Sequence, residues 1–402
     1  MEFVFNNLAY FIMLIVVLVS GCSLMAARAT MLDKRERFNF YCLMFMALIG
    51  LGGIIFTADI FTLYLFIEVT ALASFVMITQ GRNARAYEGT FKYLLLSVIA
   101  SVFMLTGVAL TLLFAHGTSF IEIRSAALAG NANFLPTAAL AFFVAGLFIK
   151  GGVVPFHGWV PDAYSSAPKA VSVFLAGIVT KVSGIYVLMR LLTLVLPATP
   201  KLNLIFLVFG TLSIFVGALA AIGQKEIRRM LAYSSISQVG YIVLALGVGT
   251  QVGIVAAVFH FFNHAVMKSQ LFLNAAALEE ATGTGDMDKM GGLMQKMPVT
   301  GITSIIASLS VAGIPPLSGF WSKLLIVMAL WLSGQYVFAF LAVLASLITL
   351  GYFLMFQRKV FFMAPTENID RVKEVGFELL FPTLLLCALT VIIGVGFFLW
   401  YY

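Results

Sequence analysis

Apolar runs of about 20 residues follow one another along almost the whole chain, and this pattern restricts its fold more than any other feature. A helix of about 20 apolar residues crosses the ~30 Å hydrocarbon core of a bilayer. A membrane β-barrel would show shorter segments of alternating polarity. We therefore expect an all-α polytopic membrane protein with about 12 transmembrane helices, at residues 3–27, 38–57, 59–80, 90–115, 134–155, 169–193, 202–222, 231–249, 252–278, 297–333, 336–356 and 376–400.

The composition agrees with this class. Of the 402 residues 62% are hydrophobic and 10% charged, and the mean hydropathy is +1.06. The first run lacks a basic start and is long, which favours a retained helix over a cleaved signal peptide. The net charge of +7 would suit nucleic acid, but the positions of the basic residues favour lipid as the partner and no nucleic acid.

Lysine and arginine are distributed unequally between alternate loops. Seventeen of the 24 lie in the loops that begin with 28–37, whereas the opposite loops hold Arg124, Arg190 and Lys201. Loops rich in basic residues stay in the cytoplasm. The pattern predicts a cell (inner) membrane protein with both termini on the outer side. The four remaining cations are intramembrane lysines: Lys150, Lys181, Lys268 and Lys323.

Cofactor signals are missing from the sequence. Cys22, Cys42 and Cys387 lie in or at the ends of apolar runs without a CxxC pattern, so we interpret them as inert. Three cysteines are too few for an iron–sulfur cluster, which needs about four ligands. Neither a Walker A loop, a GxGxxG turn, a haem motif nor a nucleophile elbow is found. We expect no cofactor on this chain, so energy must come from partners or from an ion gradient.

The stretch from Leu147, LFIKGGVVPFHGWVPDAYSSAP, combines a lysine with helix breakers. A lysine in an apolar run is costly unless it is paired or hydrated. Proline breaks a helix, and the freed backbone groups survive in a membrane only where protein or water satisfies them. Lys150 is therefore expected beside a broken helix that lines a polar cavity. His157 and Asp162 are weaker candidates that could equally cap a helix or lie at the water surface.

A second stretch resembles the first. Gly313 opens GIPPLSGFW, which is similar to GVVPFHGW at Gly152, and Lys323 lies close by as Lys150 does. The segment that holds it is too long for one simple span, so we expect a second broken helix. The two breaks lie five segments apart. Because five is an odd number, the second unit crosses the membrane in the opposite direction to the first. This predicts two inverted five-helix repeats, 38–193 and 202–356, between an N-terminal helix and loop (1–37) and a C-terminal loop and helix (357–402). Chance similarity is the alternative.

Glu68 is the one carboxylate well inside a segment. It could be a structural hydrogen-bond partner, but intramembrane lysines make an ion pair the better hypothesis. A Glu–Lys pair whose separation changes acts as a proton switch. Lys181 lies in the middle of its segment, too deep to snorkel to the interface.

His260, His264 and Lys268 are spaced four residues apart. This spacing places them in a row of about 12 Å on one helix face. Zinc is the rival to a proton relay, but a His-x₃-His pair needs a third ligand and none lies in register.

Six stretches together resemble the antiporter-like, proton-translocating membrane subunits of respiratory complex I (NADH:quinone oxidoreductase), of Mrp-type antiporters and of energy-converting membrane-bound hydrogenases. They run in family order over about residues 40–355: FIEVTALASF, LFIKGGVVPFHGWVPDAYSSAP, TKVSGIYVLMR, KEIRRMLAYSSISQVGY, FHFFNHAVMKSQLF and AGIPPLSGFWSKLL. From this resemblance we expect the first two helices of the family core to be lost here or supplied by a neighbouring small subunit. We likewise expect a shorter member of the family, without the long lateral helix of the distal complex I subunit.

The resemblance implies a role for each polar residue. Glu68 looks like the pairing glutamate, Lys150 the pumping lysine, and Lys323 the lysine from which the proton leaves, although some members carry glutamate there. The connecting relay would be formed by Lys181, His260, His264 and Lys268. It implies other membrane subunits and a peripheral redox arm, with iron–sulfur clusters or flavin on those partners.

Three functions are compatible with these residues. The favoured one is a translocase subunit of a redox-driven pump. A subunit of an Mrp-type Na⁺/H⁺ antiporter, without redox partners, is the alternative. A purely structural subunit is disfavoured because five buried charges are costly to keep. The sequence leaves proton versus sodium open.

Overall fold

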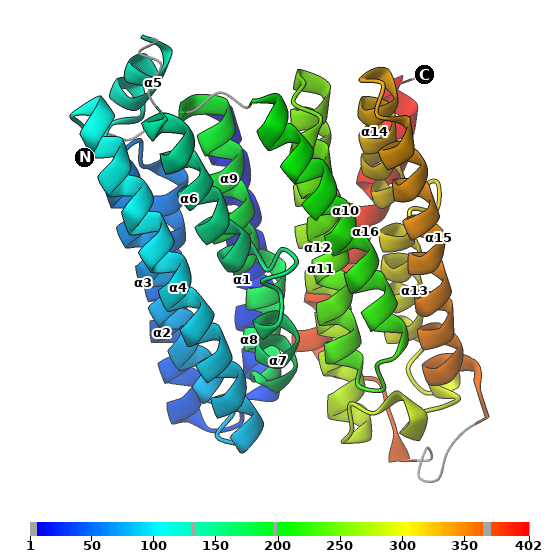
Figure 1. The fold of residues 1–402 in the computed structure, drawn as a ribbon. Coiled ribbons are helices and arrows are strands. Elements are labelled where there is room, and N and C mark those ends of the chain that lie inside the picture. Colours follow the sequence, from blue (N-terminus) through cyan, green and yellow to red (C-terminus); the bar gives the residue numbers. More distant parts are fainter. Residues whose placement is uncertain (1–5, 130–133, 196–198, 365–370, 402) are drawn as a thin grey trace.

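The computed structural model describes residues 6–129, 134–195, 199–364 and 371–401. Within these ranges the chain is all helical, with two isolated β-bridges and no strand. Long helices run side by side across the molecule (Figure 1). The all-α polytopic fold is thereby confirmed. Residues 3–5 of the first expected segment lie outside the described ranges.

Ten helices among the described residues are long and apolar enough to span a membrane. One is the composite helix Lys169–Val195. The others are α1 (Asn7–Thr30), α2 (Lys34–Phe56), α3 (Ile60–Thr79), α4 (Ala84–Ala115), α10 (Pro200–Ile222), α11 (Ile227–Gly247), α12 (Gln251–Thr282), α15 (Tyr336–Gln357) and α16 (Phe377–Tyr401). A short helix, α5 (Phe120–Leu128), was not expected; Ser119 and Glu122 form a capping box at its start.

The two remaining crossings are broken helices, as the sequence predicts. The first consists of α6 (Leu135–Gly151) and α7 (Trp159–Ser166), the second of α13 (Pro298–Ala312) and α14 (Ser318–Leu332). Each first half ends at a glycine with positive φ, Gly152 at 68° and Gly313 at 88°. A left-handed residue at this position closes the helix, and only glycine adopts it without strain. We expected this crossing to end at residue 155, but its second half-helix continues to Ser166. The sequence of α7 is too polar for the apolar pattern to reveal this helix.

The protein itself satisfies the backbone groups that the breaks set free. The Val154 N–H donates to Ser213 Oγ of α10 at 3.0 Å, and the Gly319 N–H donates to Ser310 Oγ at 3.1 Å. The Trp159 indole N–H donates to the Ile149 carbonyl at 3.0 Å. This internal satisfaction is the condition under which irregular backbone is tolerated at membrane depth.

The composite helix Lys169–Val195 is the buried centre of the first half. It begins as α8 (Lys169–Phe174), contains α9 (Val187–Arg190) and passes through π-helical turns between them. The 18-residue window that marks it as a span is entirely buried, and α1, α6 and α12 pack against it. Lys181 therefore lies in the protein interior rather than facing lipid.

Arg190 corrects one expectation. We expected it in an outer loop, but it is 3% exposed inside this helix. Its guanidinium donates to the Ile54 carbonyl at 2.9 Å and lies over the Phe120 ring at 5.1 Å. A carbonyl and an aromatic face together compensate a buried arginine, which is why the helix continues past it.

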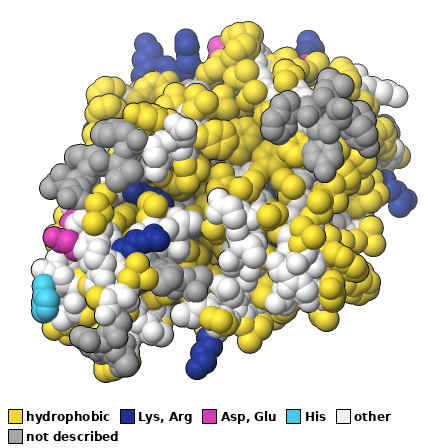
Figure 2. All heavy atoms as spheres, turned by 90° about the horizontal axis from the view of Figure 1, so that it is seen from above, with side chains coloured by type: hydrophobic (Ala, Val, Ile, Leu, Met, Phe, Trp, Pro, Cys, Tyr) yellow, Lys and Arg dark blue, Asp and Glu magenta, His cyan; other side chains and the backbone are white. Residues whose placement is uncertain are grey.

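The loops rich in basic residues gather at one end of the molecule, here called the basic end. Ion pairs join them: Arg82 with Glu36 at 2.7 Å, Lys169 with Glu280 at 2.7 Å, and Lys225 with Asp288 at 3.6 Å. Both ends of the chain lie towards the opposite side (Figure 1). Seen from that side, mostly hydrophobic side chains cover the surface (Figure 2).

Glycines bring α10 and α11 into close contact. A Cβ atom on Gly210 would lie 2.6 Å from the Leu244 nitrogen, and one on Gly217 would lie 2.5 Å from the Ser237 nitrogen. Small residues allow membrane helices to approach to backbone contact. Because Ser234 and Ser235 of α11 contact Lys268 and His264, this close packing also positions the site.

We predict that Gly217→Ala lowers the melting temperature of the purified protein in mild detergent. The added methyl group meets backbone rather than a flexible side chain, and such overpacking costs about 1–3 kcal/mol. Gly351→Ala on α15 is the control, because nothing lies within 4 Å of its Cβ position. Equal melting temperatures for the two variants would contradict the close packing.

Candidate functional site

An ion pair lies next to the first broken helix. Lys150 Nζ is 3.0 Å from Glu68 Oε1 and donates to Ser97 Oγ at 2.6 Å. Ser101 Oγ donates to the same carboxylate oxygen at 2.7 Å. Side chains of α3 and α4 thus surround the ammonium group of Lys150 on α6. The structure contains the Glu–Lys ion pair that the sequence predicts.

The two partners differ in their access to the surroundings. The Lys150 side chain is 1% exposed, whereas that of Glu68 is 25% exposed. Lys150 also stands in the last turn of α6, where the free carbonyls give the helix end a partial negative charge that favours a cation. The lysine is therefore enclosed by protein, whereas part of the Glu68 side chain reaches the protein surface.

Lys323 occupies the corresponding place at the second break. Its ammonium lies 3.5 Å from the carbonyl of Ala312, the last residue of α13, and 3.2 Å from Ser346 Oγ. It also lies 4.5 Å from the centre of the Tyr241 ring. Among the described residues it forms no ion pair. A carbonyl dipole, a hydroxyl dipole and an aromatic face stabilise the charge of Lys323, whereas the carboxylate of Glu68 stabilises the charge of Lys150.

The three residues of α12 form the expected row, and each contacts a serine on a neighbouring helix. All three are 0% exposed, and the two imidazole centres are 6.5 Å apart. The serine contacts are His260 Nδ1 to Ser322 Oγ at 2.9 Å, His264 Nε2 to Ser235 Oγ at 3.2 Å, and Lys268 Nζ to Ser234 Oγ at 2.6 Å.

The lysines of the two halves lie near this row. Lys181 and Lys268 lie within electrostatic range of His264, and Lys323 lies within range of His260. The Lys181 ammonium donates to the Ala176 carbonyl of its own helix. These separations exceed direct hydrogen bonds, so water would have to complete the links.

Unpartnered polar atoms lie along the same row. His260 Nε2, His264 Nδ1 and both polar atoms of the Gln238 side chain are buried without a hydrogen-bond partner. Ordered water is the ordinary partner of such atoms. Within the described ranges no group of three or more His, Cys, Asp or Glu side chains lies close enough to hold a metal ion.

The sequence reasoning missed the hydroxyl groups that contact the charges. They are Ser97, Ser101, Ser234, Ser235, Ser322 and Ser346. Ser97 and Ser101 are four residues apart on one face of α4, which was a usable signal. Serines in membrane helices commonly bond to their own backbone, however, so their spacing alone does not single them out.

Asp162 neither caps a helix nor lies free at the water surface. It pairs with Lys92 of α4 at 2.6 Å and with Arg229 of α11, and so ties α7 to both helices. Lys92 and Arg229 each donate a hydrogen bond to one of its two carboxylate oxygens, so two cations compensate its charge. A carboxylate that stays ionised in this way is a structural anchor rather than a proton carrier.

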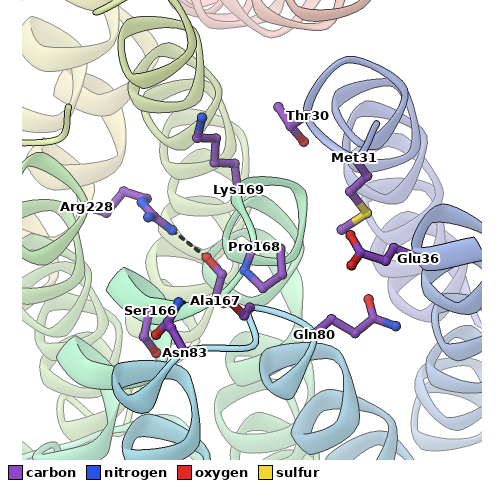
Figure 3. Close-up of a pocket in the computed structure, with 11 residues that line it drawn as sticks. Thr30, Met31, Glu36, Gln80, Asn83, Ser166, Ala167, Pro168, Lys169 and Arg228 are labelled. Atoms are coloured by element: carbon purple, nitrogen blue, oxygen red, sulfur yellow. Dashed lines mark hydrogen bonds between the residues drawn. The ribbon is translucent and has the colours of Figure 1, made fainter. Parts of the chain in front are cut away.

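A cleft of about 250 Å³ opens at the basic end between the α1–α2 turn and the α7–α8 turn (Figure 3). Its charged side chains are already paired. Arg228 binds Glu279 at 2.8 Å and the Ala167 carbonyl at 2.6 Å, and Lys169 binds Glu280. We therefore assign no ligand to this cleft.

Comparisons with known proteins agree with the geometry. A family model described as NADH:quinone oxidoreductase/Mrp antiporter, TM, matches residues 57–349. A Na⁺/H⁺ antiporter subunit from Alkalihalophilus pseudofirmus is 34% identical over 382 residues, which cover 94% of this chain and 76% of that protein. An NADH-quinone oxidoreductase subunit from Desulforudis audaxviator is 38% identical over 330 residues, which cover 79% of this chain and 64% of that protein.

A solved structure shares the fold. The chain superposes on a chain of the Mrp complex from Dietzia sp. DQ12-45-1b with a TM-score of 0.91 and 25% identity. The match covers 99% of this chain and 82% of that chain. The helices of this chain therefore follow a known arrangement.

We predict that Glu68→Gln destabilises the protein more than Lys150→Gln does. Removing Glu68 leaves a fully buried ammonium unpaired, and breaking a buried pair in this way costs roughly 3–5 kcal/mol. Removing Lys150 leaves a carboxylate that is only partly buried and still accepts the hydrogen bond from Ser101. Melting temperatures of the two variants in the same detergent check the order; the reverse order would contradict the assigned asymmetry.

Proposed function

The chain belongs to the NADH:quinone oxidoreductase/Mrp antiporter family of membrane proteins, and from this membership we propose that it translocates protons, or another cation, as one subunit of a redox-driven ion-pumping complex. Such a complex would resemble NADH:quinone oxidoreductase or a membrane-bound hydrogenase. The observation that carries the proposal is the Glu68–Lys150 ion pair at the end of a buried row that reaches the second broken helix. A structural subunit would gain nothing from so many buried charges.

In the proposed cycle the ion pair is the switch. While Glu68 is close, it stabilises the protonated form of Lys150; when the carboxylate withdraws, the ammonium remains buried without its counter-charge. The proton then passes towards Lys181. Partner subunits supply the energy by moving α3 relative to α6.

The remaining residues carry the proton across the molecule. Lys181 would pass it to His264, and His260 would pass it on to Lys323, with Lys268 as the third member of the row. Water molecules complete the links between these side chains. The proton leaves at Lys323, where no carboxylate among the described residues holds it.

The surrounding assembly follows from the same proposal. Iron–sulfur clusters or flavin belong to partner subunits of a peripheral redox arm. The basic end faces the cytoplasm, so both termini lie on the outer side of the membrane. Residues 38–193 and 202–356 are the two inverted repeats, each with one broken helix.

A subunit of an Mrp-type Na⁺/H⁺ antiporter is the second candidate. The likeness to the Alkalihalophilus antiporter protein and to a chain of the Mrp complex favours it. In that case the same row would exchange protons for sodium without redox partners.

Replacing the switch residue tests transport. We predict that Lys150→Ala in the native complex lowers the initial rate of ion transport by about 100-fold or more, because a group that transfers the proton is lost. Transport would be measured in proteoliposomes and assembly by native gel electrophoresis. Lys201→Ala, an exposed lysine at the opposite end, is the control and should leave the rate unchanged. Full transport by an assembled Lys150→Ala complex would remove the central claim.

Purification from native membranes distinguishes the two candidates. We expect peripheral iron–sulfur subunits to co-purify in mild detergent, visible by mass spectrometry and by absorbance and EPR spectra. A preparation that contains only membrane subunits and shows no such spectra would favour the antiporter instead.

A further inference from the structure

Lys268 takes part in a second set of contacts, which leads away from the row on α12. Its ammonium donates to Ser234 Oγ at 2.6 Å, and Ser234 Oγ lies 2.6 Å from the hydroxyl of Tyr352 on α15. Phe353, the next residue on α15, has its ring centre 5.6 Å from the same ammonium. Two hydroxyls thus connect Lys268 to α15 by short hydrogen bonds.

Ser234 differs from most hydroxyl residues in these helices. Thr349, Ser183 and Thr90 donate to the carbonyl four residues earlier on their own helix, which is the ordinary behaviour of such residues in a helix. Ser234 instead bonds on both sides to the side chains of other helices. A hydroxyl placed between two proton-bearing side chains can accept from one and donate to the other.

Tyr352 opens onto a small cavity at the basic end. The cavity is also lined by Gln224, Met287 and Lys359, which belong to the loops that carry the basic residues. Its water-accessible volume is about 20 Å³, which is room for roughly one water molecule. The Tyr352 side chain therefore bonds to Ser234 through its hydroxyl and also lines a water-sized space near the aqueous boundary.

We propose that Tyr352 and Ser234 form a side branch that carries protons between the basic end and Lys268. In the inward direction a hydronium ion in the cavity gives a proton to the Tyr352 oxygen as the phenol O–H passes its own proton to Ser234. Ser234 then passes its hydroxyl proton to the neutral amine of Lys268, which becomes an ammonium. No bond to carbon changes, and each hydroxyl ends with one proton as it began.

The branch gives the second half its own supply of protons. It reaches the row directly at Lys268, while the Glu68–Lys150 pair in the first half still times the transfer, so that loss of either one slows transport. This inference rests on the proposed function, because it requires that protons move along the row on α12. It adds a route and two residues that ion transport along the row alone does not require.

The test uses the intact complex in proteoliposomes, driven by its own reaction, with a pH-sensitive dye. Tyr352→Phe and Ser234→Ala should each lower the initial rate of proton transport at least about 10-fold, because a step of the relay is removed. The double variant should be no slower than either single one, since both act on one serial path. Ser234→Thr keeps the hydroxyl and should restore transport. Tyr336→Phe, the same change at the exposed start of α15, should transport at the unaltered rate.

The outcomes separate the branch from the function on which it rests. Unaltered transport by Tyr352→Phe and Ser234→Ala, with transport lost in Lys268→Ala, would refute the branch and leave the proposed function standing. Full transport by Lys268→Ala and Lys150→Ala as well would overturn both. If Tyr352→Phe does not assemble, the contrast between Ser234→Ala and Ser234→Thr decides, because the two differ in the hydroxyl.

Discussion

A buried ammonium group has to be compensated from several directions at once, and the arrangement of the helices meets this demand. Lys150 is compensated by a carboxylate on α3, by a hydroxyl on α4 and by the end of its own helix. Lys323 is compensated by the end of α13, by a hydroxyl on α15 and by an aromatic ring on α11. A continuous helix offers no free carbonyl in the middle of the membrane. The breaks therefore place the negative end of a half-helix beside Lys150 and Lys323.

Lys150 and Lys323 are equivalent in their surroundings but not in their positions within the two motifs. Lys150 precedes its break and Lys323 follows its own, so an alignment of the two motifs does not superpose them. Both ammonium groups nevertheless lie at the carbonyl end of the first half-helix, where the helix dipole is negative. A left-handed glycine, Gly152 or Gly313, creates that end in each case.

Much of this could be predicted from the sequence, because the signals are local. The length of the apolar runs predicted the crossings, and glycine followed closely by proline predicted the two breaks. Charged residues within apolar runs pointed to Glu68, Lys150 and the row on α12. The hydroxyl groups could not be found in the same way, since Ser234 and Ser346 acquire their contacts only when distant helices meet. Arg190 was misplaced for the same reason, because the Ile54 carbonyl that binds it is remote in the sequence. Local polarity identifies charges, whereas their partners are a property of packing.

The difference between the two lysine sites gives the proposed cycle its direction. A carboxylate on a separate helix can hold the ammonium of Lys150 strongly in one position and weakly in another. Around Lys323 the compensating groups are a backbone carbonyl, a hydroxyl and a ring, and their strength cannot be varied by moving one charge. The first site is thus suited to regulated loading and the second to release. If a side branch delivers protons at Lys268, loading and release can alternate in the second half while the ion pair in the first half sets the timing.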